Sequence, residues 1–275
     1  MQGYDFRRVS VTALIPAFAR GDYTAIPWAK EILAYLRSRG ATLSDGPWTE
    51  ESARFFAPVF EARFRAVSRV ISEKGATQVL ELAAGLSPRG MELSRQGALY
   101  VETDLAESIA RKREIVTAIL GAVPQNLHLC AASAIDRSQL LECCSPFAAG
   151  RPIAIATEGL LRYLTFHEKT LVARNVHQIL QRYGGWWITP DVHLRSLTQQ
   201  QTADYRQQER ETLGRNLDAN YFEDLDHAYR FFEGLGFAVD SRPLFERPQA
   251  RIPAPASGQM VDRNDFRLFV LTVKF

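Results

Sequence analysis

The residues best placed to do chemistry follow an apolar run near the end of the first third of the chain. This run, Val79–Leu82, leads into small residues that include Ala83 and Gly85, and a helical pattern starts at Arg89. In a doubly wound α/β sheet such a turn lies at the carboxyl end of the first strand, where ligands bind. Small side chains let a ligand approach the backbone closely, and the N–H groups at the helix start can bind oxygen atoms.

The turn does not match either common phosphate-binding motif. The dinucleotide fingerprint G-x-G-x-x-G requires glycine where Ala83 stands, and the next glycine after Gly85 is Gly90. A P-loop requires lysine after its last glycine, but Gly90 is followed by Met91. The turn therefore predicts a ligand without phosphates, the alternative being an ordinary tight turn between a strand and a helix.

Two acidic residues end the next apolar run. Asp104 lies 104 − 85 = 19 residues after Gly85, close to the roughly 20 expected between such a turn and an acid that holds ribose hydroxyls. A carboxylate can accept both hydroxyl hydrogens through charge-assisted bonds. Asp104 is the first candidate for this role and Glu102 the second, and the alternative is an acid that caps the following helix. A ribose without phosphates indicates S-adenosylmethionine.

The elements that must position these residues alternate between short apolar runs and helical patterns. This alternation predicts an α/β fold with a mostly parallel, seven-stranded sheet covered by helices on both faces. The last strand is expected to pair antiparallel at the end of the sheet. The expected strands are Gln78–Leu82, Ala98–Thr103, Leu127–Ala131, Ile153–Thr157, Trp186–Pro190, Gly236–Val239 and Leu268–Phe275. The expected helices are Arg89–Gln96, Ser108–Leu120, Arg137–Cys143, Phe166–Arg182 and Tyr221–Leu235, preceded by two helices within Thr12–Arg39 and a long one over Glu50–Glu73 that Pro58 could delay or bend.

Composition sets the class of protein and excludes several partners. The 275 residues carry 33 Lys and Arg against 31 Asp and Glu, a net charge of +2, so there is no global argument for nucleic acid or an anionic membrane. The sequence shows no apolar run long enough to span a bilayer and no secretory signal, which predicts a cytoplasmic protein. The chain has an odd number of cysteines, Cys130, Cys143 and Cys144, which predicts reduced, buried thiols. Because the sequence contains no C-x-x-C pair, we do not expect a metal site.

Three ordered stretches resemble the leucine carboxyl methyltransferase family, which includes bacterial O-methyltransferases related to tetracenomycin biosynthesis. They are LELAAGLSPRG (80–90), YVETDLAESIARKR (100–113) and TEGLLRYL (157–164), and SVTALIPAFARGDYTAIPWA (10–29) resembles the family's N-terminal helices. The resemblance covers about residues 55–192. It implies a Rossmann-like class I methyltransferase fold with an N-terminal helical cap over 1–50 and a methyltransferase domain over 51–275. Within that domain, residues 194–220 are polar, rich in Gln and interrupt the alternation of strands and helices, which predicts a helical lid over the site.

The resemblance also implies which residues hold S-adenosylmethionine. They are Arg63, Ala83, Gly85, Asp104, Ser133, Ala134 and Glu158, with Glu102 as the second choice for the ribose. Arg63, for which Arg65 is a competitor, matches an arginine that pairs with the methionine carboxylate. Ser133 and Ala134 stand where the family has an Asp-Leu pair at the adenine. Tyr163 matches an active-site tyrosine and is the catalytic candidate.

The implied reaction is an in-line transfer of the sulfonium methyl group to a substrate oxygen, with S-adenosylhomocysteine as the product. The acceptor would be a carboxylate or hydroxyl of a small molecule, or a protein C-terminus. Two alternatives stay open. The first is an NAD(P)-dependent oxidoreductase on a related sheet, which the broken glycine fingerprint disfavours. The second is a non-catalytic protein that binds S-adenosylmethionine, which the altered position Ser133 motivates.

Overall fold

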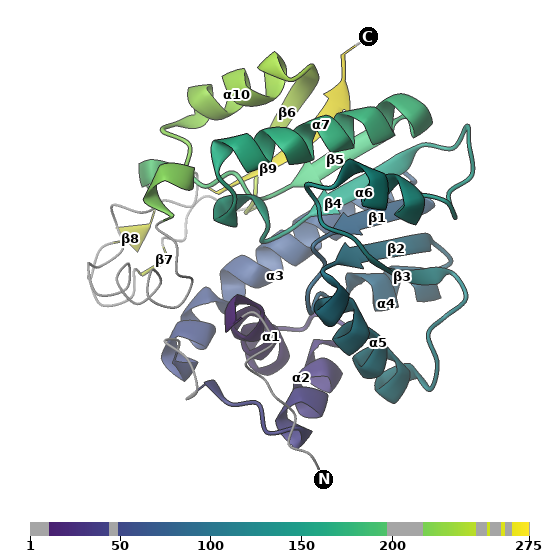
Figure 1. Ribbon diagram of the computed structural model, residues 1–275. Helices are drawn as coiled ribbons and strands as arrows, with labels where there is room; N and C mark the ends of the chain where they lie inside the picture. The colour runs from purple at the N-terminus through teal and green to yellow at the C-terminus, as the bar shows by residue number, and fades with distance from the viewer. Residues whose placement is uncertain are drawn as a thin grey trace.

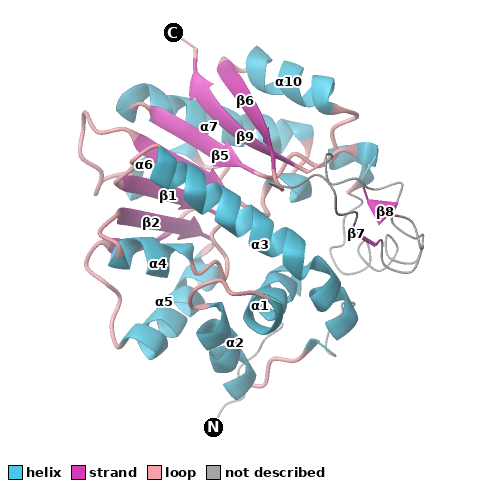
Figure 2. Cartoon of the chain, turned by 180° about the vertical axis from the view of Figure 1, so that it is seen from behind, coloured by secondary structure: helices cyan, strands magenta, loops and turns pink. Residues whose placement is uncertain are grey.

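The computed structural model describes residues 11–43, 49–196, 217–245, 252–253, 260–261 and 266–274. A seven-stranded sheet forms the middle layer, and helices cover both of its faces (Figures 1 and 2). The α/β fold with a mostly parallel sheet is therefore confirmed.

The strands of the sheet are β1 (Gln78–Leu82), β2 (Leu99–Asp104), β3 (Leu127–Ala131), β4 (Ile153–Thr157), β5 (Gly185–Thr189), β6 (Phe237–Pro243) and β9 (Arg267–Val273). The helices are α1 (Val11–Tyr23), α2 (Ala29–Ser38), α3 (Glu50–Glu73), α4 (Arg89–Arg95), α5 (Ala106–Leu120), α6 (Arg137–Cys143), α7 (Phe166–Tyr183) and α10 (Leu225–Gly234). Two short 3₁₀ turns, η3 (Leu161–Tyr163) and η4 (Asp218–Asn220), and a separate pair of strands, β7 (Ile252–Pro253) and β8 (Met260–Val261), complete the described elements.

The strand order is β3-β2-β1-β4-β5-β9-β6. The first five strands are parallel, whereas β9 pairs antiparallel with both β5 and β6. The antiparallel pairing of the last strand is as predicted, but the expected place at the end of the sheet is wrong, because β6 takes that place and β9 lies between β5 and β6. The order reverses between β1 and β4, so the chain leaves these neighbouring strands towards opposite faces. In open α/β sheets this switch point, at the carboxyl ends of the strands, is where ligands bind.

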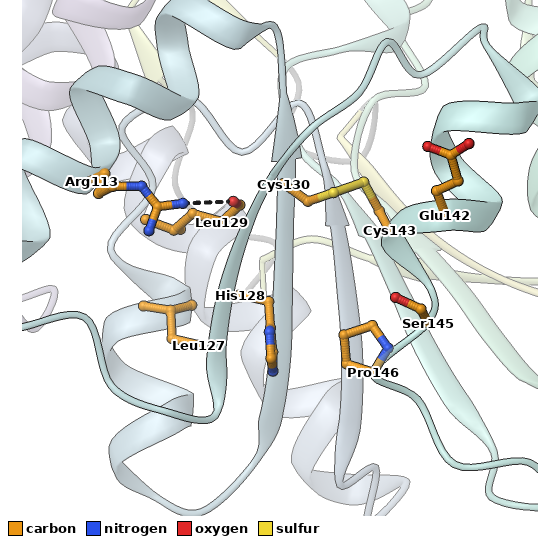
Figure 3. A pocket seen from close by; sticks show the side chains of 9 residues that line it. All are labelled: Arg113, Leu127, His128, Leu129, Cys130, Glu142, Cys143, Ser145 and Pro146. Carbon is orange, nitrogen blue, oxygen red and sulfur yellow. Dashed lines mark hydrogen bonds between the residues drawn. A yellow bond between two sulfur atoms is a disulfide. The ribbon is translucent and has the colours of Figure 1, made fainter.

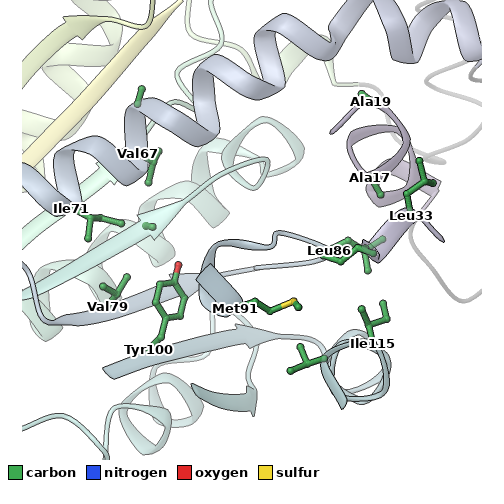
Figure 4. Packing of buried hydrophobic residues seen from close by; sticks show 14 of the residues in the cluster. Ala17, Ala19, Leu33, Val67, Ile71, Val79, Leu86, Met91, Tyr100 and Ile115 are labelled. Atoms are coloured by element: carbon green, nitrogen blue, oxygen red, sulfur yellow. The ribbon is translucent and has the colours of Figure 1, made fainter. Parts of the chain in front are cut away.

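The central strands of the sheet send alternate side chains into two separate cores. On β1, Val79 belongs to the core under α1 to α5, whereas Leu80 belongs to the core under α6, α7 and α10. Figure 4 shows Val79 and Tyr100 of the sheet packing in the first core together with Leu33 of α2. Because the N-terminal helices share a core with the sheet, they are positioned by it. The division into a cap and a second domain at residue 50 stays a prediction.

The N-termini of helices α3 and α10 are set by hydrogen bonds from the backbone to a capping side chain. Helix α3 begins at Glu50, as predicted, because the Thr49 side chain accepts a hydrogen bond of 3.2 Å from the Ser52 N–H. Pro58 lies inside this helix without ending it. Helix α10 starts later than predicted, at Leu225, because Asp224 caps it through a 2.7 Å bond from the His227 N–H. Most of the predicted lid, residues 197–216, lies outside the described residues, as does Phe275 at the end of the last predicted strand.

The prediction of reduced thiols is wrong for two of the three cysteines. Cys130 at the end of β3 and Cys143 at the end of α6 form a disulfide, and Cys144 is a buried free thiol. The return of α6 alongside β3 brings the two Cα atoms to 5.9 Å, within the range that a disulfide spans. Sequence spacing alone did not reveal this approach. Among the described helices none is both long and apolar enough to cross a bilayer. The described residues also contain no cluster of three or more side chains that could hold a metal ion.

Candidate functional site

Asp104 ties together the two loops that leave β1 and β2. Its carboxylate accepts one hydrogen bond of 2.7 Å from the Gly85 N–H and another of 2.7 Å from the Leu105 N–H. The side chain is partly exposed at the carboxyl edge of the sheet, next to the switch point. Each oxygen has a second lone pair, so the carboxylate can still accept hydroxyl groups while its orientation is fixed.

The turn after β1 has the shape that a close ligand needs. Ala83 and Gly85 adopt left-handed backbone conformations with φ of 53° and 51°. A Cβ placed on Gly85 would meet no atom within 4 Å, so the space above this residue is open. Helix α4 starts a few residues later, at Arg89. Ala83 therefore adopts at this turn a left-handed conformation that glycine favours. This explains how an alanine can replace the glycine at this position.

Glu102 does not reach this edge. It is fully buried under α4 and α5, where its carboxylate lies 2.8 Å from the Lys112 ammonium. A Cβ on Gly90 would come within 2.1 Å of Glu102 Oε1, so the glycine makes room for this acid. Burial outweighs Lys112 and raises the pKa of Glu102 to about 7. Of the two predicted ribose ligands, only Asp104 lies at the carboxyl edge.

The loop after β3 carries the predicted adenine residues. The Ser133 N–H donates to Gln139 Oε1 at 2.9 Å, and the Ala134 carbonyl accepts from Asn175 Nδ2 at 3.1 Å. Asp136 caps α6 by accepting from the Gln139 N–H at 3.1 Å, and these local hydrogen bonds lower the pKa of its carboxyl. The loop is thus fixed by α6 and α7, and at its start the Ala132 N–H donates to the Asp104 carbonyl at 2.9 Å.

Two exposed apolar side chains flank the same region, and sequence reasoning missed both. Leu105 follows Asp104 and is 63% exposed, and Ile135 follows Ala134 and is 39% exposed. They are the large hydrophobic side chains left most open in the described part of the chain. Their position directly after two predicted ligand residues was the signal available in the sequence. Each offers exposed apolar surface next to a predicted ligand residue.

Glu158, after β4, is held by two arginines. Its oxygens lie 2.5 Å from Arg20 Nη2 and 2.5 Å from Arg89 Nη2. Burial alone would raise the pKa of Glu158, but the two guanidinium groups outweigh it and hold the pKa at about 2. Arg89 also pairs with Glu81, and Tyr100 donates to Glu81 at 2.8 Å. Glu158 is therefore ionised, and it joins helix α1 to the edge of the sheet.

Arg63 forms a buried ion pair with Asp191, the residue that follows Pro190 after β5. Asp191 also accepts from the backbone N–H groups of Gly159 at 2.7 Å and Leu160 at 2.8 Å. Both partners of the pair are buried, and sequence reasoning did not select Asp191. The competing Arg65 lies instead on the exposed side of α3, paired with Glu61 at 2.7 Å.

Arg63 and Arg20 each keep one buried guanidinium nitrogen without a partner in the described part of the chain. Within the described residues, Nε of Arg63 and Nε of Arg20 are buried and make no hydrogen bond. An unpaired buried donor costs free energy, because its bond to water is lost and not replaced. Both side chains have one carboxylate at the sheet edge, Asp191 and Glu158 respectively. Two guanidinium groups that retain free donors there fit an incoming carboxylate.

Tyr163 lies in the η3 turn on the β4 side of the edge, with the Arg162 guanidinium 5.3 Å from its ring centre. Arg162 also donates to the Tyr221 hydroxyl at 3.2 Å. The ring of half-buried His193 lies 6.3 Å from that of Tyr221, and its Nδ1 is 3.2 Å from the Asp191 carbonyl oxygen. Burial and the nearby arginines keep the pKa of His193 well below its usual value, so the imidazole is neutral.

The fold and this edge together define an S-adenosylmethionine-dependent methyltransferase, and the comparisons agree with that class. The family model described as leucine carboxyl methyltransferase matches residues 31–177, more than half of the chain. The chain therefore belongs to the leucine carboxyl methyltransferase family.

Solved structures support the fold. A DUF574 family protein from Streptomyces avermitilis aligns with a TM-score of 0.56 at 17% identity, over 96% of this chain and 97% of that chain. The methyltransferase domain of bacterial CtHen1-C aligns with a TM-score of 0.53 at 11% identity, over 78% of this chain and 99% of that chain. No curated protein matches the sequence significantly. At these identities the likeness concerns the arrangement of the sheet and helices.

Proposed function

We propose that this methyltransferase transfers the methyl group to oxygen, with a carboxylate or hydroxyl of a small molecule or a protein C-terminus as acceptor. For the cofactor, the observation that carries the proposal is the Asp104 carboxylate, held by Gly85 and Leu105 at the switch point of the sheet. It supports a ribose site beside a turn that has no phosphate-binding sequence. Oxygen as the acceptor atom is supported by membership of the leucine carboxyl methyltransferase family.

In this proposal each end of S-adenosylmethionine has its own partners. Asp104 takes the ribose hydroxyls, and Ser133 and Ala134 contact the adenine, whose faces Leu105 and Ile135 cover. The unpaired donors of Arg63 and Arg20 take the carboxylate of the methionine part. Ala83, Gly85 and Glu158 line the path between them. When bound, the cofactor supplies an electrophilic methyl group on sulfur.

The chain's own residues then have to position an oxygen and keep water out. A carboxylate acceptor is ionised near neutral pH and needs no general base, so orientation and exclusion of water supply the rate. A hydroxyl acceptor would lose a proton and would need a base within hydrogen-bond reach. Tyr163 and Arg162 are on the β4 side, where they can orient the acceptor. No described side chain stands out as a strong base there, which favours a carboxylate or an acidic phenol.

The decisive experiment is methyl transfer from S-adenosylmethionine labelled in the methyl group, with a cell extract as the source of acceptors. The proposal expects labelled product that disappears when Asp104→Ala replaces the wild-type protein. Mild base releases the label as methanol from a methyl ester but not from an ether, so the test separates the two oxygen acceptors. Labelling of nitrogen or carbon would overturn O-methylation.

The alternatives have distinct outcomes in a companion measurement of thermal stability. Stabilisation by NAD or NADP and none by S-adenosylmethionine would support the oxidoreductase and contradict our proposal. Stabilisation by S-adenosylmethionine without transfer to any component of the extract would support a non-catalytic binding protein. Stabilisation together with transfer supports the proposal.

A further inference from the structure

A surface pocket of about 290 Å³ lies along the outer edge of the sheet, beside β3 (Figure 3). β3 is the first strand in the sheet order and pairs with β2 alone among the described strands. Residues from α5, β3 and the end of α6 line the pocket, and both Cys130 and Cys143 are among them. The disulfide is therefore part of a surface that a small molecule can reach.

The disulfide closes the loop that carries two proposed cofactor ligands. Cys130 precedes Ala131, which lies in register with Asp104 on the neighbouring strand. Cys143 ends α6, 13 positions later in the sequence. The bond thus ties together both ends of the segment that contains Ser133 and Ala134. The position of this segment relative to Asp104 depends in part on that bond.

No second thiol of the described residues stands ready to open the bond from inside. Cys144 is adjacent to Cys143 in sequence, but it is buried, and burial raises the pKa of its thiol to about 12. Exchange requires a thiolate, so Cys144 stays unreactive at neutral pH. Of the two bonded sulfurs, that of Cys130 belongs to the more exposed residue, since Cys143 is only 3% exposed.

We propose that the Cys130–Cys143 disulfide is a redox modification site, opened by a dithiol reductant at this pocket, whose reduction weakens binding of S-adenosylmethionine. The inference rests on the proposed placement of the cofactor. A reductant thiolate attacks the Cys130 sulfur and forms a mixed disulfide, and the Cys143 sulfur leaves as a thiolate that takes up a proton. The second thiol of the reductant then attacks the reductant sulfur that is bonded to Cys130. The bond between that sulfur and Cys130 breaks, and Cys130 is released as a thiol. The protein gains two electrons and two protons, and the reductant becomes a cyclic disulfide.

Reduction loosens the loop without unfolding it, because other contacts remain. Gln139 still holds the Ser133 N–H, and Asn175 still holds the Ala134 carbonyl. We therefore expect a moderate effect: roughly five- to tenfold weaker binding, at the low end of couplings between two sites. Coupling of this kind is reciprocal, so the cofactor must favour the disulfide over the dithiol by the same factor.

The test compares calorimetric titrations of S-adenosylmethionine into the full-length oxidised protein and into the same protein reduced with dithiothreitol. The expected result is weaker binding after reduction, with a matching loss in the Cys130→Ser, Cys143→Ser double variant that is insensitive to reductant. Cys144→Ser is the control and keeps the redox response of the wild type. If the double variant fails to fold, the two forms of the wild type decide.

The reciprocal measurement needs no substitution. Protein is equilibrated in a dithiothreitol redox buffer with and without saturating S-adenosylmethionine, and the fraction of disulfide is read after trapping free thiols. A shift towards the disulfide by the same factor supports the proposal. Equal affinities of the two forms, or a disulfide that dithiothreitol leaves intact in the folded protein, would overturn it. Failure of both forms to bind S-adenosylmethionine would overturn the proposed function itself.

Discussion

Arg20 of helix α1 and Glu158 after strand β4 are 138 positions apart in sequence, yet their side chains lie 2.5 Å from each other. Glu158 is also paired with Arg89, so one buried carboxylate holds two guanidinium groups from different helices. This contact anchors the N-terminal helices to the edge of the sheet at the candidate site. Its strength depends on the charge of Glu158.

The pH dependence of stability follows from this carboxylate. The pKa of Glu158 is about 2 in the folded chain, against an ordinary value of 4.5. Between these values the unfolded chain binds more protons, so the contribution of Glu158 is complete above about pH 4.5 and is lost as pH falls towards 2. In urea unfolding from pH 7 to pH 3, Glu158→Gln should be less stable than the wild type at pH 7, with a gap that narrows on acidification. A gap that stays constant over this range would contradict the assignment.

Cofactor binding should depend on Asp104. In Asp104→Ala, loss of a carboxylate that accepts charge-assisted bonds should weaken S-adenosylmethionine binding by at least about tenfold. Asp104→Asn is the matched control, because its amide oxygen can still accept one backbone bond, and it should bind with intermediate affinity. Isothermal titration calorimetry measures both. Undiminished binding in a folded Asp104→Ala protein would remove the ribose assignment.

Two arginines, two positions apart on α3, should behave very differently. Arg63→Met leaves the buried Asp191 carboxylate without its cation, which should lower the free energy of unfolding by about 3–5 kcal/mol. Arg65→Met removes only an exposed pair with Glu61 and should cost about 0.5 kcal/mol or less. Chemical denaturation compares the two variants. Equal losses would show that the Arg63–Asp191 pair is not the stabilising contact described above.

The exposed apolar side chains offer a test of binding that spares stability. Leu105→Ser and Ile135→Ser remove surface that is already open to solvent, so unfolding should change by no more than about 0.5 kcal/mol. If these side chains cover the adenine, the double variant should bind S-adenosylmethionine at least about tenfold more weakly, since a covered leucine contributes about 1.5–3 kcal/mol. Unchanged affinity with unchanged stability would place the adenine elsewhere.

Much of the fold was predictable from the sequence because its signals are local. The apolar runs gave β1, β3 and β4 with their observed bounds, and the glycine turn and Asp104 were found from their separation along the chain. Glu102 shows the limit of that reasoning. It lies two residues before the end of β2, so its side chain points to the same face of the strand as that of Asp104. That position is inside the sheet, where α4 covers it, and not at the carboxyl edge.

The missed parts of the site depend on contacts between distant segments. Asp191 meets Arg63 across 128 positions, and no sequence spacing announces that approach. The same holds for Arg20 and for the disulfide, whose cysteines meet only once α6 has packed back on β3. Such contacts are fixed by the packing of whole elements, whereas the turn after β1 is fixed by its own few residues.

The place of β9 between β5 and β6 has a consequence for synthesis on the ribosome. β9 follows β6 in the chain, but it lies between β5 and β6 in the sheet and bonds to both. Until residues 267–273 have emerged, β5 presents an unpaired edge and β6 has no neighbour, while the five parallel strands can already assemble. A nascent chain stalled before that point would expose an edge open to pairing with other chains, so chaperone engagement should fall when the final strand leaves the exit tunnel.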